Sequence, residues 1–284
     1  MEVTVAKSAG FCFGVKRAVD MVYKCAKESD LPVYTYGPII HNEVVTGDFE
    51  SMGVKVLDEN TDLSSIQQGL IIIRSHGVSK KIMDSIEKCG LMVKDATCPF
   101  VKKIHNHVSA CSKNGDTIII IGNKNHPEVQ GIVGWSSSER TFVIDSVEEA
   151  KAFFAHKNEK ICIVSQTTYN YNKFQELVEI ITQKGYDINV INTICDATHE
   201  RQAEALMLAK KSDAMIVIGS LTSSNTQKLY EICKKECANT YYIQTIDDLD
   251  VTKTQAIHSV GITAGASTPN KLIEEVQKYV RNEL

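Results

Sequence analysis

Residues 117–131 read TIIIIGNKNHPEVQG, an apolar β-branched run that leads through a polar loop into a helical pattern. Two other segments share this form: LIIIRSHGVSKK at residues 70–81 and AMIVIGSLTSSNTQKL at residues 214–229. Each predicts a buried strand followed by a helix. This order is typical of parallel sheets, because the chain needs a long crossover, usually a helix, before the next parallel strand can begin. The repetition predicts an α/β fold built from comparable units.

The rest of the chain alternates in the same way between short β-branched runs and stretches with apolar residues three or four positions apart. The expected strands cover residues 3–6, 33–36, 70–73, 91–94, 117–121, 160–164, 188–191, 214–218, 240–243 and 259–263. The expected helices begin near Val15, Glu43, Ser79, Pro99, Glu128, Tyr171, His199, Thr226 and Pro269. No low-complexity linker marks a domain boundary, so boundaries are inferred from the repetition.

The composition predicts a globular chain with a packed core, since 43% of its 284 residues are hydrophobic and 23% are charged. Lysine and arginine total 31 against 35 acidic residues, a net charge of −4 that argues against a nucleic-acid partner. The longest apolar runs fall far short of the roughly 20 residues that span a bilayer, so no membrane segment is expected. Residues 1–20 lack the charge order and apolar core of a signal peptide, which favours the cytoplasm.

The nine cysteines favour a metal or catalytic role over a disulfide framework, because their number is odd and the cytoplasm keeps thiols reduced. Cys12, Cys98 and Cys195 stand in related settings, GFCFG, DATCPF and ICDAT, 86 and 97 residues apart. Each is expected directly before a helix, where unpaired backbone N–H groups and the helix dipole lower the pKa of a thiol. The other six lie within expected helices or strands and are interpreted as core residues: Cys25, Cys89, Cys111, Cys162, Cys233 and Cys237.

A loop cysteine taken alone is more often structural, but the recurrence of one setting at regular intervals favours a ligand role for all three. Three thiolates are one short of a closed four-cysteine site. This shortage suggests an iron–sulfur cluster with one iron left open for substrate.

Polar loops after the strands form a second set of candidates, because a helix N-terminus with added Ser, Asn or His donors attracts phosphate. Taken singly, the serines are better explained as N-caps and the histidines as structural side chains. His41, His76 and His126 differ, because each is expected in an equivalent strand-to-helix turn. The candidates for anion binding are His41 with Asn42, His76, His126, Ser223, Ser224, Asn225 and Ser267.

Glu128 lies two residues after His126, near an expected helix start. A carboxylate there stabilises the helix by about 0.3 to 1 kcal/mol whether or not it has another function. Beside a cluster and a phosphate, burial and negative charge would raise its pKa and suit it to donate a proton. Thr167 and Thr168, which follow the strand expected at residues 160–164, are candidates to complete a proton relay.

Nine motifs occur in the order and spacing of one known family: GFCFGV, HN at residues 41–42, SHGV, DATCP, HPE, SQTT, the cysteine of TIC, SSN and TAGAS. Together they resemble the 4-hydroxy-3-methylbut-2-enyl diphosphate reductases over the whole chain. The resemblance implies a trefoil of three pseudo-equivalent α/β units around a central 4Fe-4S cluster. The units would be residues 14–97, 98–193 and 194–266, with residues 1–13 and 267–284 as closing segments.

The resemblance also implies the chemistry. Cys12, Cys98 and Cys195 would hold the cluster. The implied reaction is reductive dehydroxylation of (E)-4-hydroxy-3-methylbut-2-enyl diphosphate to isopentenyl diphosphate and dimethylallyl diphosphate, the last step of the methylerythritol phosphate pathway, with ferredoxin or flavodoxin as electron donor. The implied catalytic residues are the proton donor Glu128 with His126, Thr167 and Thr168. The implied substrate-binding residues are His41, His76, His126, Thr167, Thr168, Ser223, Ser224, Asn225 and Ser267.

Two other functions stay open for such a sequence. One is a non-catalytic sensor whose cluster reports oxygen or iron, although Glu128 and the anion-binding loops argue against it. The other is a hydro-lyase that uses an open iron as a Lewis acid without electron transfer. One departure from relatives, Arg74 in IRSHG, is expected either to attract the diphosphate or to point outward.

Overall fold

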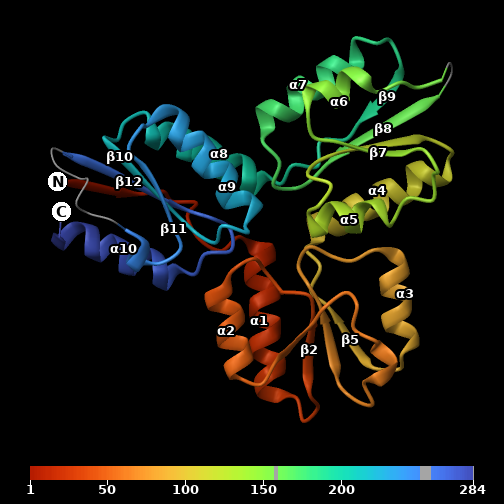
Figure 1. Ribbon diagram of the computed structural model, residues 1–284, viewed down its shortest axis with the longest axis horizontal. Coiled ribbons are helices and arrows are strands. Elements are labelled where there is room, and N and C mark those ends of the chain that lie inside the picture. The colour runs from red at the N-terminus through yellow and green to blue at the C-terminus, as the bar shows by residue number, and fades with distance from the viewer. Residues whose placement is uncertain (157–158, 250–256, 284) are drawn as a thin grey trace. The chain divides into compact units, whose positions relative to one another are not determined.

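The computed structural model describes residues 1–156, 159–249 and 257–283, and in them the chain forms three parallel four-stranded sheets (Figure 1). The strands are β1 (Glu2–Val5), β2 (Val33–Tyr36), β3 (Lys55–Leu57), β4 (Leu70–Ile73), β5 (Met92–Asp95), β6 (Thr117–Ile121), β7 (Thr141–Ile144), β8 (Lys160–Ser165), β9 (Asp187–Val190), β10 (Ala214–Ile218), β11 (Thr240–Ile243) and β12 (Ser259–Ala264). The α-helices are α1 (Phe13–Glu28), α2 (Glu43–Ser51), α3 (Lys80–Lys88), α4 (Pro99–Lys113), α5 (Pro127–Val133), α6 (Val147–Ala152), α7 (Tyr171–Thr182), α8 (Asp196–Ala209), α9 (Ser224–Glu236) and α10 (Asn270–Glu283). Short 3₁₀ turns are η1 (Leu63–Ser65) and η2 (Ile246–Asp248).

All three sheets have the same strand order. The first sheet runs β3-β2-β4-β5, the second β7-β6-β8-β9 and the third β11-β10-β12-β1. If the strands of a sheet are numbered by their order along the chain, they lie side by side in the order second, first, third and fourth. In the third sheet the fourth place is taken by the N-terminal strand, whose Glu2 and Val5 pair with Ser259 and Ile262 of β12. The predicted class, three comparable α/β units, is confirmed.

The second sheet shows why its central strand is a run of isoleucines. Ile118 and Ile120 pack with α4 and α5, while Ile119 and Ile121 pack with α6 and α7 on the opposite face (Figure 1). Successive side chains of a strand point to opposite faces, so a parallel strand covered on both faces needs apolar residues at every position. This is the pattern from which the sequence predicts the strand.

The ten expected strands are present, with ends shifted by at most one or two residues, but β3 and β7 were not predicted. Both lie at a sheet edge and pair on one side only. In β3, Lys55 and Val56 are exposed, so the strand lacks a buried β-branched run. The short helix α6, which follows β7, was missed with it.

The chain divides into two compact units, each treated by itself below. The terminal unit comprises Met1–Lys16, His41–Gly47 and Cys195–Leu284, and contains the third sheet. The central unit comprises Arg17–Ile40 and Asp48–Ile194, and contains the first and second sheets. Across the described ranges, none of the helices has the length and apolar character required to traverse a bilayer.

Candidate active site

The predicted site residues stand at the carboxyl ends of strands, the edge at which open parallel sheets bind ligands. The loops after the first strands, β2, β6 and β10, and the helix starts that follow them carry His41 with Asn42, His126 with Glu128, and Ser223 with Ser224 and Asn225. The loops after the third strands, β4, β8 and β12, carry His76, Thr167 with Thr168, and Ser267. The loops after the fourth strands, β5, β9 and β1, carry Cys98, Cys195 and Cys12.

This arrangement corrects one expectation. His41 and His126 follow the first strands of their sheets and are equivalent, but His76 follows a third strand and is not. Sequence spacing alone could not reveal this, because the strand order becomes apparent only once pairing partners are known.

Glu128 is almost fully buried, with 2% of its surface exposed. It lies in the first turn of α5, in the central unit. The backbone N–H of Thr167 donates to its Oε1 at 2.6 Å, and the Thr167 hydroxyl donates to its Oε2 at 2.8 Å. Burial raises the pKa of Glu128 to about 7, against the opposing effect of the two hydrogen bonds from Thr167. The carboxyl group therefore carries a proton over much of the neutral range.

Two histidines lie beside this carboxyl group in the central unit. His126 is the N-cap of α5, and its Nδ1 accepts a hydrogen bond from the Glu128 backbone N–H at 3.1 Å. The rings of His126 and His76 meet edge to face, with centroids 5.4 Å apart. The Thr168 hydroxyl accepts a hydrogen bond from Gln166 Nε2 at 3.1 Å, so of the two threonines it is Thr167 that holds Glu128.

The terminal unit holds a cluster of neutral polar groups. The Ser267 hydroxyl donates to the His41 carbonyl at 2.9 Å and lies 3.5 Å from the Ser223 hydroxyl, which caps α9. Asn225, in the first turn of α9, is 4% exposed, and neither atom of its amide has a hydrogen-bond partner among the described residues. The same holds for Asn42 Nδ2. Because an unsatisfied buried amide costs about 1–3 kcal/mol, these groups indicate a polar ligand.

The three predicted cysteine ligands all directly precede helices and are half-buried. Cys98 and Cys195 are the N-caps of α4 and α8 but make no side-chain capping hydrogen bond. The Cys12 N–H donates to the Ala266 carbonyl at 3.3 Å. All three cysteines thus stand at the start of a helix, at the position that the sequence predicts.

The expected lowering of thiol pKa is wrong for Cys195. Its pKa is raised, first by burial and further by the nearby charge of Cys12, although backbone N–H groups of Ala197 and Thr198 oppose the shift. Desolvation of the thiolate therefore outweighs the stabilisation available at the helix start.

The cysteines interpreted as core residues are confirmed where the structure buries them. Cys162 packs between isoleucines and valines of the second sheet, and Cys233 and Cys237 pack against α8. Cys25 is also buried, whereas Cys89, the C-cap of α3, and Cys111, on α4, are half-buried.

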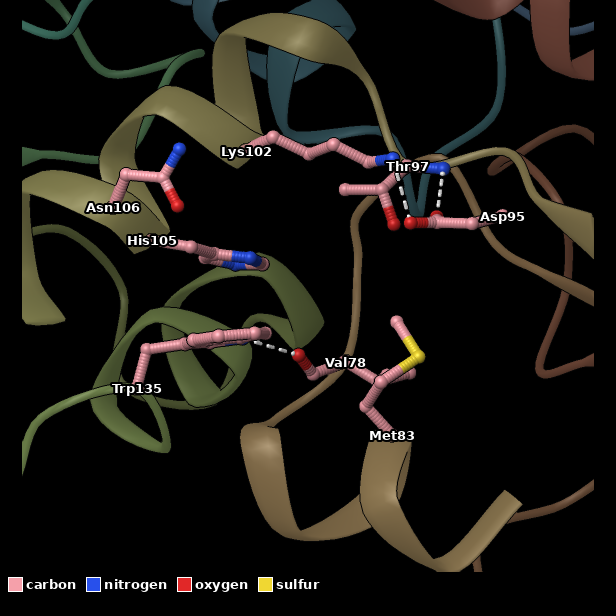
Figure 2. A pocket seen from close by; sticks show the side chains of 8 residues that line it. All are labelled: Val78, Met83, Asp95, Thr97, Lys102, His105, Asn106 and Trp135. Atoms are coloured by element: carbon pink, nitrogen blue, oxygen red, sulfur yellow. Dashed lines mark hydrogen bonds and ion pairs between the residues drawn. The ribbon is translucent and has the colours of Figure 1, made fainter. Parts of the chain in front are cut away.

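The segment before Cys98 is held by the side chain of Asp95, which contacts Thr97 and Lys102 (Figure 2). Asp95 Oδ1 accepts from the Thr97 N–H at 2.8 Å, and Asp95 Oδ2 pairs with Lys102 Nζ at 2.7 Å. Burial opposes ionisation of Asp95, but the hydrogen bonds from Lys102 and Thr97 together outweigh it and lower its pKa. The Cys98 N–H donates to the Ser75 carbonyl at 2.9 Å, which ties this loop to the one that carries His76.

A cavity of about 160 Å³ lies on the flank of the same loop, between Asp95, Lys102 and the stacked rings of His105 and Trp135 (Figure 2). Burial lowers the pKa of His105 to about 4, so its imidazole is neutral. Trp135 Nε1 donates to the Val78 carbonyl at 2.8 Å. These side chains line the cavity, which lies between α3, α4 and the end of α5.

Arg74 follows neither of its expected roles. It is buried, pairs with Glu59 Oε1 at 2.6 Å and donates from Nε to the Gly77 carbonyl at 3.3 Å. Its charge is therefore neutralised within the first sheet, and the side chain does not point outward.

The fold and these loops define an α/β enzyme with an acid of near-neutral pKa, together with polar loops and three cysteines that follow the carboxyl ends of its strands. Comparison with known proteins narrows the class. A family model described as LytB protein matches residues 3–281, and the chain belongs to this family.

Full-length relatives and solved structures agree with this assignment. Relatives from Caldanaerobacter subterraneus subsp. tengcongensis and Geobacter sulfurreducens, both named 4-hydroxy-3-methylbut-2-enyl diphosphate reductase, are 45% and 46% identical to this chain, each match covering 99% of it and 97% of the relative. The structure of E-1-hydroxy-2-methyl-but-2-enyl-4-diphosphate reductase from Plasmodium falciparum matches with a TM-score of 0.91 at 31% identity, over 99% of this chain and 87% of that one. A second structure, described as (E)-4-hydroxy-3-methyl-but-2-enyl diphosphate reductase, the terminal enzyme of the non-mevalonate pathway, matches with a TM-score of 0.72 at 40% identity over 99% of both chains. The family and the oxidoreductase class predicted from the motifs are confirmed.

Proposed function

We propose that the chain reduces (E)-4-hydroxy-3-methylbut-2-enyl diphosphate to isopentenyl diphosphate and dimethylallyl diphosphate, the last step of the methylerythritol phosphate pathway, in the cytoplasm. The observation that carries the proposal is the buried Glu128, held by Thr167 and protonated near neutral pH, in a chain whose full-length relatives bear the reductase name. The units proposed for this enzyme remain residues 14–97, 98–193 and 194–266, closed by residues 1–13 and 267–284.

We assign the metal site to Cys12, Cys98 and Cys195, which would hold a 4Fe-4S cluster with one iron open. Their shared place after the fourth strand of each sheet supports the assignment. When bound, such a cluster supplies electrons one at a time and an open coordination position. The proposed electron donor is a ferredoxin or flavodoxin.

The diphosphate is assigned to neutral donors at strand ends. Ser223, Asn225 and Ser267 lie within one polar cluster, and the unsatisfied amide of Asn225 supports a missing anionic partner. Ser224 begins the same helix, and its backbone N–H adds to the positive potential there. His41 and the histidines of the central unit, His76 and His126, are also assigned to substrate binding, with Thr167 and Thr168 near the reacting end.

Proton delivery falls to Glu128. Two electrons and two protons convert the allylic alcohol to the alkene and water, and Glu128 gives one proton to the departing hydroxyl. Thr167 orients the carboxyl group through both of its hydrogen bonds, and His126 fixes the start of the helix that carries Glu128. Burial excludes bulk water from the carboxyl group, so the proton is not lost before the hydroxyl leaves.

The test of the function is electron consumption per product. Protein purified without air is assayed for iron and sulfide, then supplied with reduced methyl viologen and the substrate. The proposed reductase consumes two electrons for each diphosphate product. Product without electron consumption would identify a hydro-lyase, and a cluster without turnover would identify a sensor. Either result would refute the proposal.

The rate of turnover should fall as pH rises above about 7, because Glu128 donates its proton only while it is protonated. Its raised pKa keeps the carboxyl group protonated below that value and leaves it ionised above it. The measurement is kcat as a function of pH with a chemical electron donor whose supply is not limiting. A kcat that stays level to about pH 9 would contradict the assigned role.

Asn225→Leu should strengthen the fold while weakening substrate binding. Leucine is larger but keeps the branch at Cγ, and it removes an amide that has no partner among the described residues; removal of this unsatisfied group should raise the free energy of unfolding by about 1–3 kcal/mol. The apparent KM for the diphosphate should rise by about tenfold or more, because a donor to the anion is lost. Chemical denaturation and steady-state kinetics measure the two effects. An unchanged KM would remove Asn225 from the proposed site.

A further inference from the structure

Two arginines contact the cysteine loops in a way that the sequence does not reveal. Arg17 lies on α1, five residues after Cys12. Within the central unit its guanidinium donates to three successive carbonyls, those of Asp95 at 3.1 Å and of Ala96 and Thr97 at 3.2 Å each. These are the three residues that directly precede Cys98. One rigid cation thus fixes the backbone that leads to the second cysteine.

Arg201 makes the corresponding contact in the terminal unit. It lies on α8, six residues after Cys195, and is only 5% exposed. One of its terminal nitrogens donates to the Gly10 carbonyl at 2.6 Å and the other to the Ala197 carbonyl at 3.0 Å. Gly10 precedes Cys12 by two residues. The two arginines therefore follow one pattern. Arg17, on the helix after Cys12, holds the loop before Cys98, and Arg201, on the helix after Cys195, holds the loop before Cys12.

The loop held by Arg201 has little room to rearrange. Gly10 has a φ of +96°, and a Cβ atom there would lie 2.6 Å from Asn270 Oδ1. The charge of Arg201 also lies close to Cys12 and Cys195: desolvation lowers the pKa of Arg201, and the two thiols oppose that shift. Through its bonds to Gly10 and Ala197, Arg201 thus places a buried positive charge beside the turns that carry Cys12 and Cys195.

The helix after Cys98 makes a different contact. Its cation, Lys102, pairs with Asp95 in the loop before the same cysteine (Figure 2). The loop of Asp95, Ala96 and Thr97 is therefore held from two sides, by Arg17 at its carbonyls and by the Asp95 side chain at the Thr97 N–H. These contacts are made by protein groups alone, so they preorganise the loop for its ligand.

We infer that Arg17 and Arg201 are positioning residues for the proposed cluster: each fixes the loop before a cysteine ligand and adds permanent positive charge to its surroundings. The inference rests on the proposed function, because it presupposes that Cys12, Cys98 and Cys195 bind iron. Reduction adds negative charge to a cluster, so nearby cations make its reduction potential more positive. Fixed loops slow the loss of iron, since a cysteine that detaches stays close to its ligand position.

The experiment compares Arg17→Gln, Arg201→Gln and the control Arg140→Gln, each purified without air. Like them, Arg140 donates to a backbone carbonyl, that of Phe154 at 3.2 Å, and it pairs with Glu159 at 2.9 Å, but neither partner lies in a loop that leads to a proposed cysteine ligand. The readouts are the reduction potential of the cluster and the rate at which a ferrous-iron chelator removes its iron. For both test variants we expect a more negative potential and iron loss about tenfold faster or more, with Arg140→Gln close to wild type.

Arg17→Lys and Arg201→Lys separate the two effects. Lysine keeps the positive charge but cannot grip successive carbonyls with a planar fork, so the potential should stay near that of wild type while iron loss remains fast. If the glutamine variants fail to fold, the lysine variants decide. Wild-type potentials and wild-type rates of iron loss in folded variants would overturn the inference. A wild-type protein that binds no iron would instead overturn the proposed function itself.

Discussion

Replacement of Glu128 by glutamine should lower kcat by about two to four orders of magnitude while the iron content and the apparent affinity for substrate stay close to wild type. Glutamine has the same shape and keeps a carbonyl oxygen that can accept the Thr167 N–H, so the local structure should persist. It has no acidic proton to give to a leaving hydroxyl. The measurement is single-turnover and steady-state product formation with reduced methyl viologen, together with visible absorption of the cluster.

Glu149→Gln is the matched control for this variant. Glu149 also lies in the first turn of a helix, and it also accepts a hydrogen bond from a backbone N–H, that of Asp145 at 2.7 Å. It is exposed, however, and is not one of the proposed catalytic residues. Its kcat should equal that of wild type. Turnover by Glu128→Gln within about threefold of wild type would exclude Glu128 as the proton donor, because a general acid contributes about 100-fold or more.

Cys98→Ser should abolish the cluster, and Cys111→Ser should retain it. Serine is a favourable N-cap, so α4 should still begin at Pro99 and the protein should fold without iron. A hydroxyl does not replace a thiolate as a ligand to iron in this setting. Iron and sulfide analysis, visible absorption and circular dichroism of protein prepared without air measure the outcome.

Cys111 is a suitable comparison because it lies on the same helix, half-buried against the core of the second sheet. Its replacement tests whether any cysteine near this helix affects iron content. Equal loss of iron from both variants would contradict the assignment of Cys98. Cys98→Ser should also lose all turnover, whereas Glu128→Gln loses turnover with its iron in place, so the two variants separate metal binding from proton delivery.

The elements predicted from sequence are those whose pattern reports burial on both faces. Ile118–Ile121 is apolar at every position because helices cover both sides of the strand, and the same holds for the strand at residues 70–73. The edge strands β3 and β7 form because they pair with β2 and β6, which supply their backbone hydrogen-bond partners. These partners come from another part of the sequence, so the local pattern does not reveal the pairing. Edge strands of this kind carry little local signal.

The candidate site was predictable in its residue types and strand-end positions but not in its contacts. Cysteine, histidine and serine loops after apolar runs can be located from the sequence, since chain direction alone places them at one edge of a parallel sheet. The choice of Thr167 over Thr168 as partner of Glu128 depends on tertiary packing between β6 and β8 loops. The contacts of Arg17 and Arg201 join segments about 80 and 190 residues apart, so no local pattern announces them.

The N-terminal strand that closes the third sheet has a consequence for biosynthesis. β1 precedes the other described strands in the chain, whereas its neighbour in the sheet, β12, follows them. During translation, Val3 and Val5 cannot pack until the core residue Ile262 has been synthesised. Likewise, the Cys12 N–H cannot form its hydrogen bond until the Ala266 carbonyl is present. An unfinished or prematurely terminated polypeptide therefore cannot complete the Cys12 loop. The proposed cluster would then be loaded only after residues 259–266 have been synthesised and have joined the N-terminal segment.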